Sequence, residues 1–290
     1  MSSTIKITPL GGVIGAQISG VNLQEKLDED TVCSIRTALL THRVIFFRDQ
    51  SGMSPTDQVN FAKHFGELTP AHPLVGGLDE DHPEVLVLDS SNFTLGVGKK
   101  GNGTSYNNAW HTDVTFAPNP PLATVLRANQ LPSRGGDTLW ADLTDAYNTL
   151  SEPIKNLLDG LVAVHHTGNT FSALRDGAGS DKLTSLEPVR HPVVRVHPET
   201  MEKCLFVNPT FTSHIEGLSK GESDALLNFL YIHSIVPERV IRWSWREGDV
   251  VMWDNRNTTH YAAADYKERR VMHRVTIRGD RPVGPNGSID

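Results

Sequence analysis

Two histidines and one aspartate have the types and the spacing of a metal site. His111 and Asp113 form a His-x-Asp pair, and His260 follows an apolar run and a turn much later in the chain. Iron(II) oxygenases use two histidines and one carboxylate on one face of an octahedron, which leaves positions open for a cosubstrate and oxygen. The same residue types could instead hold a catalytic zinc ion with an activated water.

The pair alone is a weak signal, because roughly one His-x-Asp match is expected by chance in a chain with 13 histidines. Read separately, His111 and Asp113 could be a hydrogen-bonded pair and His260 a loop histidine. Their context favours the metal site. We expect the pair to lie on a strand, where residues i and i+2 share a face. Arg270 follows His260 by ten residues, on the approach to the last expected strand. Three His-x-Glu pairs compete with this site, and they begin at His82, His197 and His214.

Composition places these residues in an ordinary globular chain. The 290 residues are 38% hydrophobic and 21% charged, so we expect one domain over residues 1–290. A net charge of -7 disfavours nucleic acid and anionic membrane surfaces as partners. The sparse cysteines, Cys33 and Cys204, are interpreted as buried thiols in a reducing compartment. No signal peptide or membrane-spanning run is evident, which predicts a cytoplasmic protein.

Strand signals outnumber helix signals along the chain. Helices are predicted to begin after Asp28, after Ser54, which precedes a proline, and after Ser219, which forms a capping box with Glu222. Because strands and helices do not alternate regularly, the pattern favours a mainly β jelly roll with peripheral helices. The glycine-rich segments 96–108 and 168–185 are expected to be mobile loops. Strands are predicted at 44–48, 85–89, 123–129, 193–197, 205–207, 241–245, 250–253 and 271–277.

Several longer motifs resemble a known family. They include WHTDVTF at 110–116, GGDTLW at 135–140, WDNR at 253–256 and RRVMHR at 269–274, with further likeness over residues 7–20. The chain resembles the TauD/TfdA family of iron(II)- and 2-oxoglutarate-dependent dioxygenases over nearly its whole length. The resemblance implies a double-stranded β-helix, which is a form of jelly roll. It also implies a homo-oligomer, a dimer or a tetramer.

The resemblance assigns a role to each candidate residue. It places Fe(2+) between His111, Asp113 and His260, which makes them both metal-binding and catalytic. Thr138 and Arg270 match the pair that holds the distal carboxylate of 2-oxoglutarate, and a guanidinium suits that task because it binds carboxylates through two hydrogen bonds. Arg274 matches the residue that faces the sulfonate of the substrate. The implied substrate-binding set is His72, Asn107, Val114, Phe171, Phe211 and Arg274.

The implied reaction hydroxylates the carbon next to sulfur in taurine or a related sulfonate. O2 is consumed, 2-oxoglutarate becomes succinate and CO2, and the product releases sulfite and an aldehyde. The family carries a tyrosine in the substrate site where this chain has Val75. A smaller side chain there would open the site, so alkyl sulfate esters or bulkier sulfonates are the alternative substrates.

Three other classes of protein are alternatives to this assignment. A halogenase of this superfamily lacks the carboxylate ligand, so Asp113 argues against that activity. A zinc hydrolase or a cupin-like binding protein could use the same three residues. Thr138 and Arg270 discriminate, because a zinc hydrolase needs no anchor for the carboxylate of a cosubstrate. A binding protein should show no oxygen-dependent turnover of 2-oxoglutarate.

Overall fold

The computed structural model describes residues 5–71, 76–91, 109–167 and 187–287. The two glycine-rich segments predicted to be mobile lie outside these ranges. So do His72, Val75, Asn107 and Phe171, which the sequence assigned to the substrate site or its neighbourhood.

The three predicted helices are present, and each begins at the predicted cap. The Asp28 side chain accepts a hydrogen bond from the backbone of α1 (Glu29–His42), while Ser54 and Ser219 form capping boxes before α2 (Pro55–Lys63) and α6 (Lys220–Ser234). Such caps satisfy backbone N–H groups that have no partner within the helix. Two shorter helices, α3 (Leu143–Asn148) and α4 (Glu152–Leu158), were not predicted.

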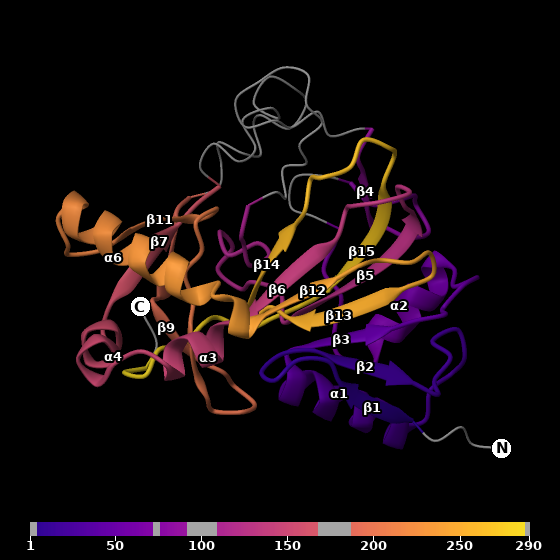
Figure 1. Ribbon diagram of the computed structural model, residues 1–290, viewed down its shortest axis with the longest axis horizontal. Helices are drawn as coiled ribbons and strands as arrows, with labels where there is room; N and C mark the ends of the chain where they lie inside the picture. Colours follow the sequence, from indigo (N-terminus) through magenta and orange to yellow (C-terminus); the bar gives the residue numbers. More distant parts are fainter. Residues whose placement is uncertain (1–4, 72–75, 92–108, 168–186, 288–290) are drawn as a thin grey trace.

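Two sheets form the centre of the fold (Figure 1). The larger sheet has seven strands. Neighbouring strands pair antiparallel, except that β2 runs parallel to β3. The smaller sheet has three strands. In spatial order, the larger sheet contains β1 (Lys6–Pro9), β2 (Ala16–Ser19), β3 (Val44–Phe47), β13 (Val250–Asp254), β5 (Ala123–Gln130), β15 (Val271–Ile277) and β4 (Leu86–Asp89), and the smaller sheet contains β12 (Val240–Trp243), β6 (Thr138–Asp142) and β14 (Thr258–Ala262).

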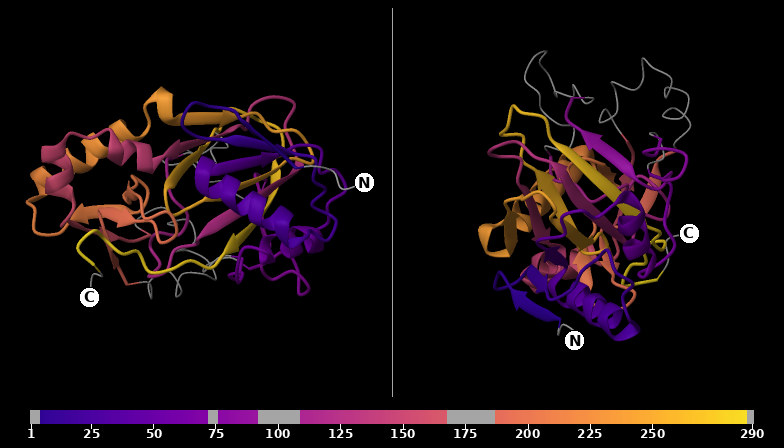
Figure 2. Two further views of the ribbon diagram at one scale, coloured as in Figure 1. Left: turned by 90° about the horizontal axis from the view of Figure 1, so that it is seen from below. Right: turned by 90° about the vertical axis from the view of Figure 1, so that its right-hand side faces the viewer.

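The central strands of the larger sheet are buried on both faces, as β3 illustrates. Ile45 and Phe47 belong to a core that includes α1 and α2, whereas Val44 and Phe46 belong to a second core shared with Trp140 of the smaller sheet. Alternate side chains of a strand point to opposite faces, so the unbroken apolar run of β3 serves both cores. Figure 2 shows α1 lying against the N-terminal strands of this sheet.

A third group of elements lies at one end of the two sheets, where Figure 1 shows α3, α4 and α6. Their apolar side chains form a separate cluster with the short strands nearby. These strands are β7 (Val162–His165), β8 (Val189–Pro192) and β11 (Thr212–Ile215) in one sheet, and β9 (Val194–Val196) and β10 (Lys203–Leu205) in another, with a 3-10 turn η2 at Pro237–Arg239. The expected class, mainly β with peripheral helices in a jelly roll, is therefore confirmed.

Two expectations about the fold need correction. Cys33 was expected to be buried, but it is exposed on α1; only Cys204 is buried, and burial raises the pKa of its thiol to about 12. Strand β14 (Thr258–Ala262) was not predicted, because its sequence, Thr-Thr-His-Tyr-Ala, lacks the apolar run of a typical core strand. In the described parts of the chain, no helix has the length and apolar character needed to span a membrane.

Candidate active site

The backbones of His111 and His260 are paired directly. His260 lies on β14, and each of the two residues donates its backbone N–H to the carbonyl oxygen of the other, at 2.9 and 2.8 Å. This isolated antiparallel bridge places two histidines from distant parts of the chain side by side. Their rings lie 4.1 Å apart between centroids.

Asp113 reaches the same place by a turn, which corrects the expectation of a strand. The chain leaves the bridge at His111 and turns over residues 113–116, where the Ala117 N–H donates to the Val114 carbonyl oxygen at 2.9 Å. Val114 has a φ of 54°, in the left-handed region that β-branched residues rarely adopt. The side chains of His111 and Asp113 converge because of this turn and not because of strand alternation.

The three side chains present a set of potential ligand atoms to one point. The Nε2 atoms of His111 and His260 each lie 3.9 Å from Oδ1 of Asp113, and the three ligand atoms lie within 4.8 Å of one another. All three residues are buried. Among the described residues, this is the one cluster of at least three His, Cys, Asp or Glu side chains that could hold a metal ion, so the His-x-Glu pairs form no rival site there.

The protonation of the two histidines suits metal binding. Nδ1 of His111 lies 2.8 Å from the Ala109 carbonyl oxygen, which can only accept, so Nδ1 carries the hydrogen and Nε2 keeps a free lone pair. Burial lowers the pKa of both His111 and His260, which favours neutral rings. Two neutral imidazole nitrogens and one carboxylate oxygen are the ligands expected for iron(II), so the donor set fits that metal.

Asp113 is held by a chain of directed hydrogen bonds from the larger sheet. The hydroxyl of Thr124 on β5 donates to Oδ2 at 2.8 Å, and the Asn255 amide donates to that hydroxyl at 2.7 Å. The Trp253 indole in turn donates to Oδ1 of Asn255 at 2.9 Å, which fixes the orientation of the amide. Burial raises the pKa of Asp113, but Arg274 and the two histidines lower it by more, so the pKa lies below its ordinary value and the carboxylate stays ionised.

Two buried arginines offer donors that no described residue accepts. Nη1 of Arg274, on β15, donates to Oδ1 of Asp113 at 2.8 Å, while its Nε and Nη2 atoms have no partner among the described residues. Nε of Arg270 donates to the Gly136 carbonyl oxygen at 3.1 Å, and its buried Nη2 likewise lacks a described partner. Buried N–H groups without partners are costly, and charged ones more so. The arrangement therefore fits two anionic ligands, one at each guanidinium.

Thr138 and the described substrate residues complete this region. Thr138 is buried on β6, two residues after Gly136, whose carbonyl oxygen holds Arg270. The ring of Phe211 meets the His111 ring edge-on at 6.3 Å and packs on Phe116 at 5.0 Å. Val114 is half-buried in the turn that follows Asp113.

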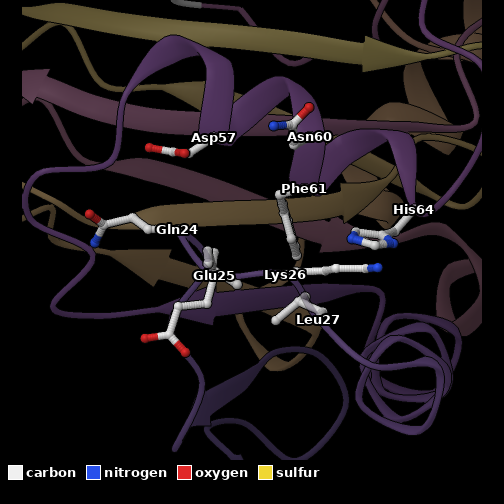
Figure 3. Close-up of a pocket in the computed structure, with 9 residues that line it drawn as sticks. Gln24, Glu25, Lys26, Leu27, Asp57, Asn60, Phe61 and His64 are labelled. Carbon is white, nitrogen blue, oxygen red and sulfur yellow. The ribbon is translucent and has the colours of Figure 1, made fainter.

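A separate cavity of about 300 Å³ lies against α2 (Figure 3). Its walls contain none of the predicted site residues, and most of the lining side chains are polar and at least partly exposed. It therefore takes no part in the arrangement described above. The lining residues are Leu23, Gln24, Glu25, Lys26, Leu27, Asp57, Asn60, Phe61 and His64.

Comparison with known proteins identifies the family. The family described as "Taurine catabolism dioxygenase TauD, TfdA family" matches residues 6–276. The chain belongs to this family. An alkylsulfatase from Acinetobacter baylyi is 38% identical, over 98% of this chain and 88% of the relative. An alpha-ketoglutarate-dependent sulfate ester dioxygenase from Pseudomonas putida is 39% identical, over 98% of this chain and 93% of the relative.

Solved structures agree with this assignment. The crystal structure of a putative alpha-ketoglutarate-dependent taurine dioxygenase from Burkholderia xenovorans has a TM-score of 0.83 and 41% identity, and covers 98% of this chain and 93% of that one. The structure of AAD-2 in complex with Mn(II) and N-oxalylglycine has a TM-score of 0.78 and 27% identity, and covers 96% and 99%. This TauD/TfdA member is thus a 2-oxoglutarate-dependent dioxygenase, with iron(II) and 2-oxoglutarate as its cofactors.

The sequence interpretation missed three supporting residues in this site. Thr124 and Asn255 orient Asp113, and Trp245 donates to Thr138. Asn255 lies within the WDNR motif, so its position was noticed but its partner was not. A buried strand threonine and a tryptophan just beyond the end of β12 carry no comparable signal, because their roles depend on contacts with distant segments.

Proposed function

We propose that this dioxygenase oxidises the carbon atom that bears an anionic sulfo group. The main support is Arg274, which is buried, donates to Asp113 and keeps two N–H groups without a described partner. An oxyanion bound by these groups would lie beside the metal ligands. The carbon attached to that oxyanion would then be the nearest part of the substrate to the reacting centre.

The other residues take roles that their contacts support. His111, Asp113 and His260 would hold the iron, whose chemistry, when bound with 2-oxoglutarate, is the activation of O2 for hydroxylation. Arg270 and Thr138 would hold the distal carboxylate of 2-oxoglutarate. Phe211 and Phe116 would exclude water from one side of the site.

The proposed product decomposes without a hydrolytic residue. When a hydroxyl stands on a carbon bearing a sulfonate, the carbon–sulfur bond breaks, its electrons leave with sulfite, and loss of the hydroxyl proton gives an aldehyde. With an alkyl sulfate ester, the carbon–oxygen bond breaks instead and sulfate leaves. In both cases 2-oxoglutarate becomes succinate and CO2.

Two substrate classes are candidates. A taurine-type sulfonate is the first, supported by the family resemblance and by the match of Arg274 to the sulfonate position. An alkyl sulfate ester is the second, because the two relatives at 38% and 39% identity are named for sulfate ester chemistry. Val75, in place of the family tyrosine, supports the second class or a bulkier sulfonate.

The test uses enzyme that has been loaded with iron(II) in the absence of air. A panel of sulfonates and alkyl sulfates is then assayed with 2-oxoglutarate and O2. Succinate shows turnover, while sulfite or sulfate identifies the bond that breaks. Sulfite from taurine at a high KM supports the first candidate, and sulfate with no sulfite from any sulfonate supports the second. Val75→Tyr should raise kcat/KM for taurine relative to a longer alkanesulfonate.

Metal dependence tests the three ligands separately. EDTA should abolish turnover, and iron(II) should restore it where zinc does not. His111→Ala, Asp113→Ala and His260→Ala should each lose coupled turnover, whereas the exposed His64→Ala serves as the matched control. Recovery of activity with zinc alone would favour a zinc hydrolase. If one of the three alanine variants kept full activity, its residue would be excluded from the metal site.

A further inference from the structure

One hydrogen bond determines which way the Thr138 hydroxyl can point. Nε1 of Trp245 lies 3.0 Å from Oγ1 of Thr138. An indole N–H can only donate, so Thr138 accepts here and its own hydrogen remains available for another acceptor. No described residue accepts that hydrogen, although the Thr138 side chain is buried at 2% exposure.

The neighbouring guanidinium is fixed in a similar way. The Gly136 carbonyl oxygen occupies Nε of Arg270, and the Gly136 N–H donates to Asp265 at 2.8 Å, which anchors the turn itself. The Nη2 atom of Arg270 is then the buried donor without a described partner. Thr138 and Arg270 therefore each keep a free donor in the same part of the site.

We infer that Trp245 is a positioning residue, which holds the Thr138 hydroxyl as a donor to the distal carboxylate of 2-oxoglutarate. The inference rests on the proposed role of Thr138 and Arg270 as the carboxylate anchor. Without the indole N–H, the hydroxyl is free to rotate and loses the bond that fixed its oxygen atom. Trp245 itself does not touch the cosubstrate in this scheme and acts through Thr138.

A double-mutant cycle tests this inference by binding and not by turnover. The Kd of 2-oxoglutarate is measured by calorimetry, without air, on Mn(II)-loaded wild type, Trp245→Phe, Thr138→Val and the double variant. Loss of one neutral hydrogen bond should weaken binding about 3- to 10-fold in Trp245→Phe. The same change should have no further effect once Thr138 is valine, because the hydroxyl is already absent.

Two controls separate this role from packing. Trp243→Phe removes an indole N–H that bonds to Asp249 and should leave the Kd of 2-oxoglutarate unchanged. A 2-oxo monocarboxylic acid, which lacks the distal carboxylate, should bind wild type and Trp245→Phe equally. Weaker binding of that acid by Trp245→Phe would show that the indole acts by packing.

The outcomes distinguish the inference from the proposed anchor. If Thr138→Val does not weaken 2-oxoglutarate, Thr138 leaves the proposed site and the inference falls with it. If Thr138→Val weakens binding but Trp245→Phe does not, the anchor stands and the inference is wrong. Equal weakening by Trp245→Phe in both backgrounds would also overturn it.

Discussion

The carboxylate of Asp113 is shared by more partners than any other group in the site. Oδ1 accepts from Arg274 and faces both histidine Nε2 atoms, whereas Oδ2 is reserved for the Thr124 hydroxyl. A carboxylate with one oxygen fixed by a neutral donor can present the other to a cation in a single orientation. Removing a partner that orients a metal ligand typically lowers metal affinity or activity about 10- to 100-fold.

Thr124→Val should therefore weaken metal binding while leaving the fold intact. The substitution keeps the shape of the side chain and removes the donor to Oδ2, so we expect about a 10- to 100-fold higher Kd for iron(II) or Mn(II). Competition against a chelator of known affinity measures it. Thr276→Val, a buried strand threonine whose hydroxyl bonds to Thr69, is the matched control. Equal metal affinity in the two variants would refute the role of Thr124.

Arg270 and Arg274 should fail in different ways when each is replaced by alanine. Arg270→Ala should raise the KM for 2-oxoglutarate, whereas Arg274→Ala should weaken the sulfo substrate and leave uncoupled 2-oxoglutarate decay. Removing one partner of a buried charged contact costs about 2 to 5 kcal/mol. Because Arg274 also contacts Asp113, metal affinity must be measured beside the kinetics. Identical phenotypes would show that the two roles are wrongly divided.

At the scale of elements, the sequence predicted the helices and strands that are specified by local features, such as capping residues and apolar runs. Capping residues identified α1, α2 and α6, and apolar runs identified β3, β5, β13 and β15. The same rules missed β6 and β14, because these strands carry polar side chains that face the site or pair across the smaller sheet. The three proposed metal ligands were predicted from their residue types and from the family motifs, and the structure brings their side chains together. Their geometry was not found, since the turn at Asp113 and the bridge to His260 depend on contacts between distant segments.

The turn before β6 gives a test at this scale. Gly136 has a φ of 73°, and an added Cβ would lie 3.1 Å from Cδ of Arg270 and 3.2 Å from the Tyr266 ring. Gly136→Ala should therefore lose about 1 to 2 kcal/mol of stability from the backbone alone. It should also displace Arg270 and raise the Kd of 2-oxoglutarate.

Gly221→Ala is the matched control for that change. Gly221 lies near the start of α6, and an added Cβ would meet nothing within 4 Å. Alanine is the better helix former, so this variant should gain roughly 0.5 to 1 kcal/mol. Its 2-oxoglutarate affinity should stay at the wild-type value. Chemical unfolding and calorimetry measure both quantities, and an unchanged affinity in Gly136→Ala would contradict the proposed anchor.

At the scale of the whole molecule, buried histidines should make stability depend on pH. His191 is 1% exposed, and Nε2 must donate to the carbonyl oxygens of Thr115 and Ala117 at 2.9 and 3.1 Å. Burial lowers the pKa of His191 to about 4, from an ordinary value of 6.5. Between these values the unfolded chain takes up a proton that the folded chain does not, so stability falls as pH decreases from 6.5 to 4.

For His191 this linkage amounts to about 2 kcal/mol between pH 7 and pH 5. His191→Gln keeps a donor but cannot titrate, so its free energy of unfolding should fall less over that interval, even if it is lower at pH 7. Urea unfolding at the two pH values measures the difference. His64→Gln, at an exposed position, is the control. Parallel losses in wild type and His191→Gln would exclude this source of acid sensitivity.

The strand order also determines when the site can exist during synthesis. Strand β13 lies between β3 and β5, and β15 lies between β5 and β4, so the larger sheet cannot close until residues near 277 have left the ribosome. A nascent chain that ends before His260 has a histidine and a carboxylate but neither the last ligand nor the two arginines. Such a chain should hold iron only weakly. Oxygen activation at this site would therefore require that the chain has been synthesised through β15.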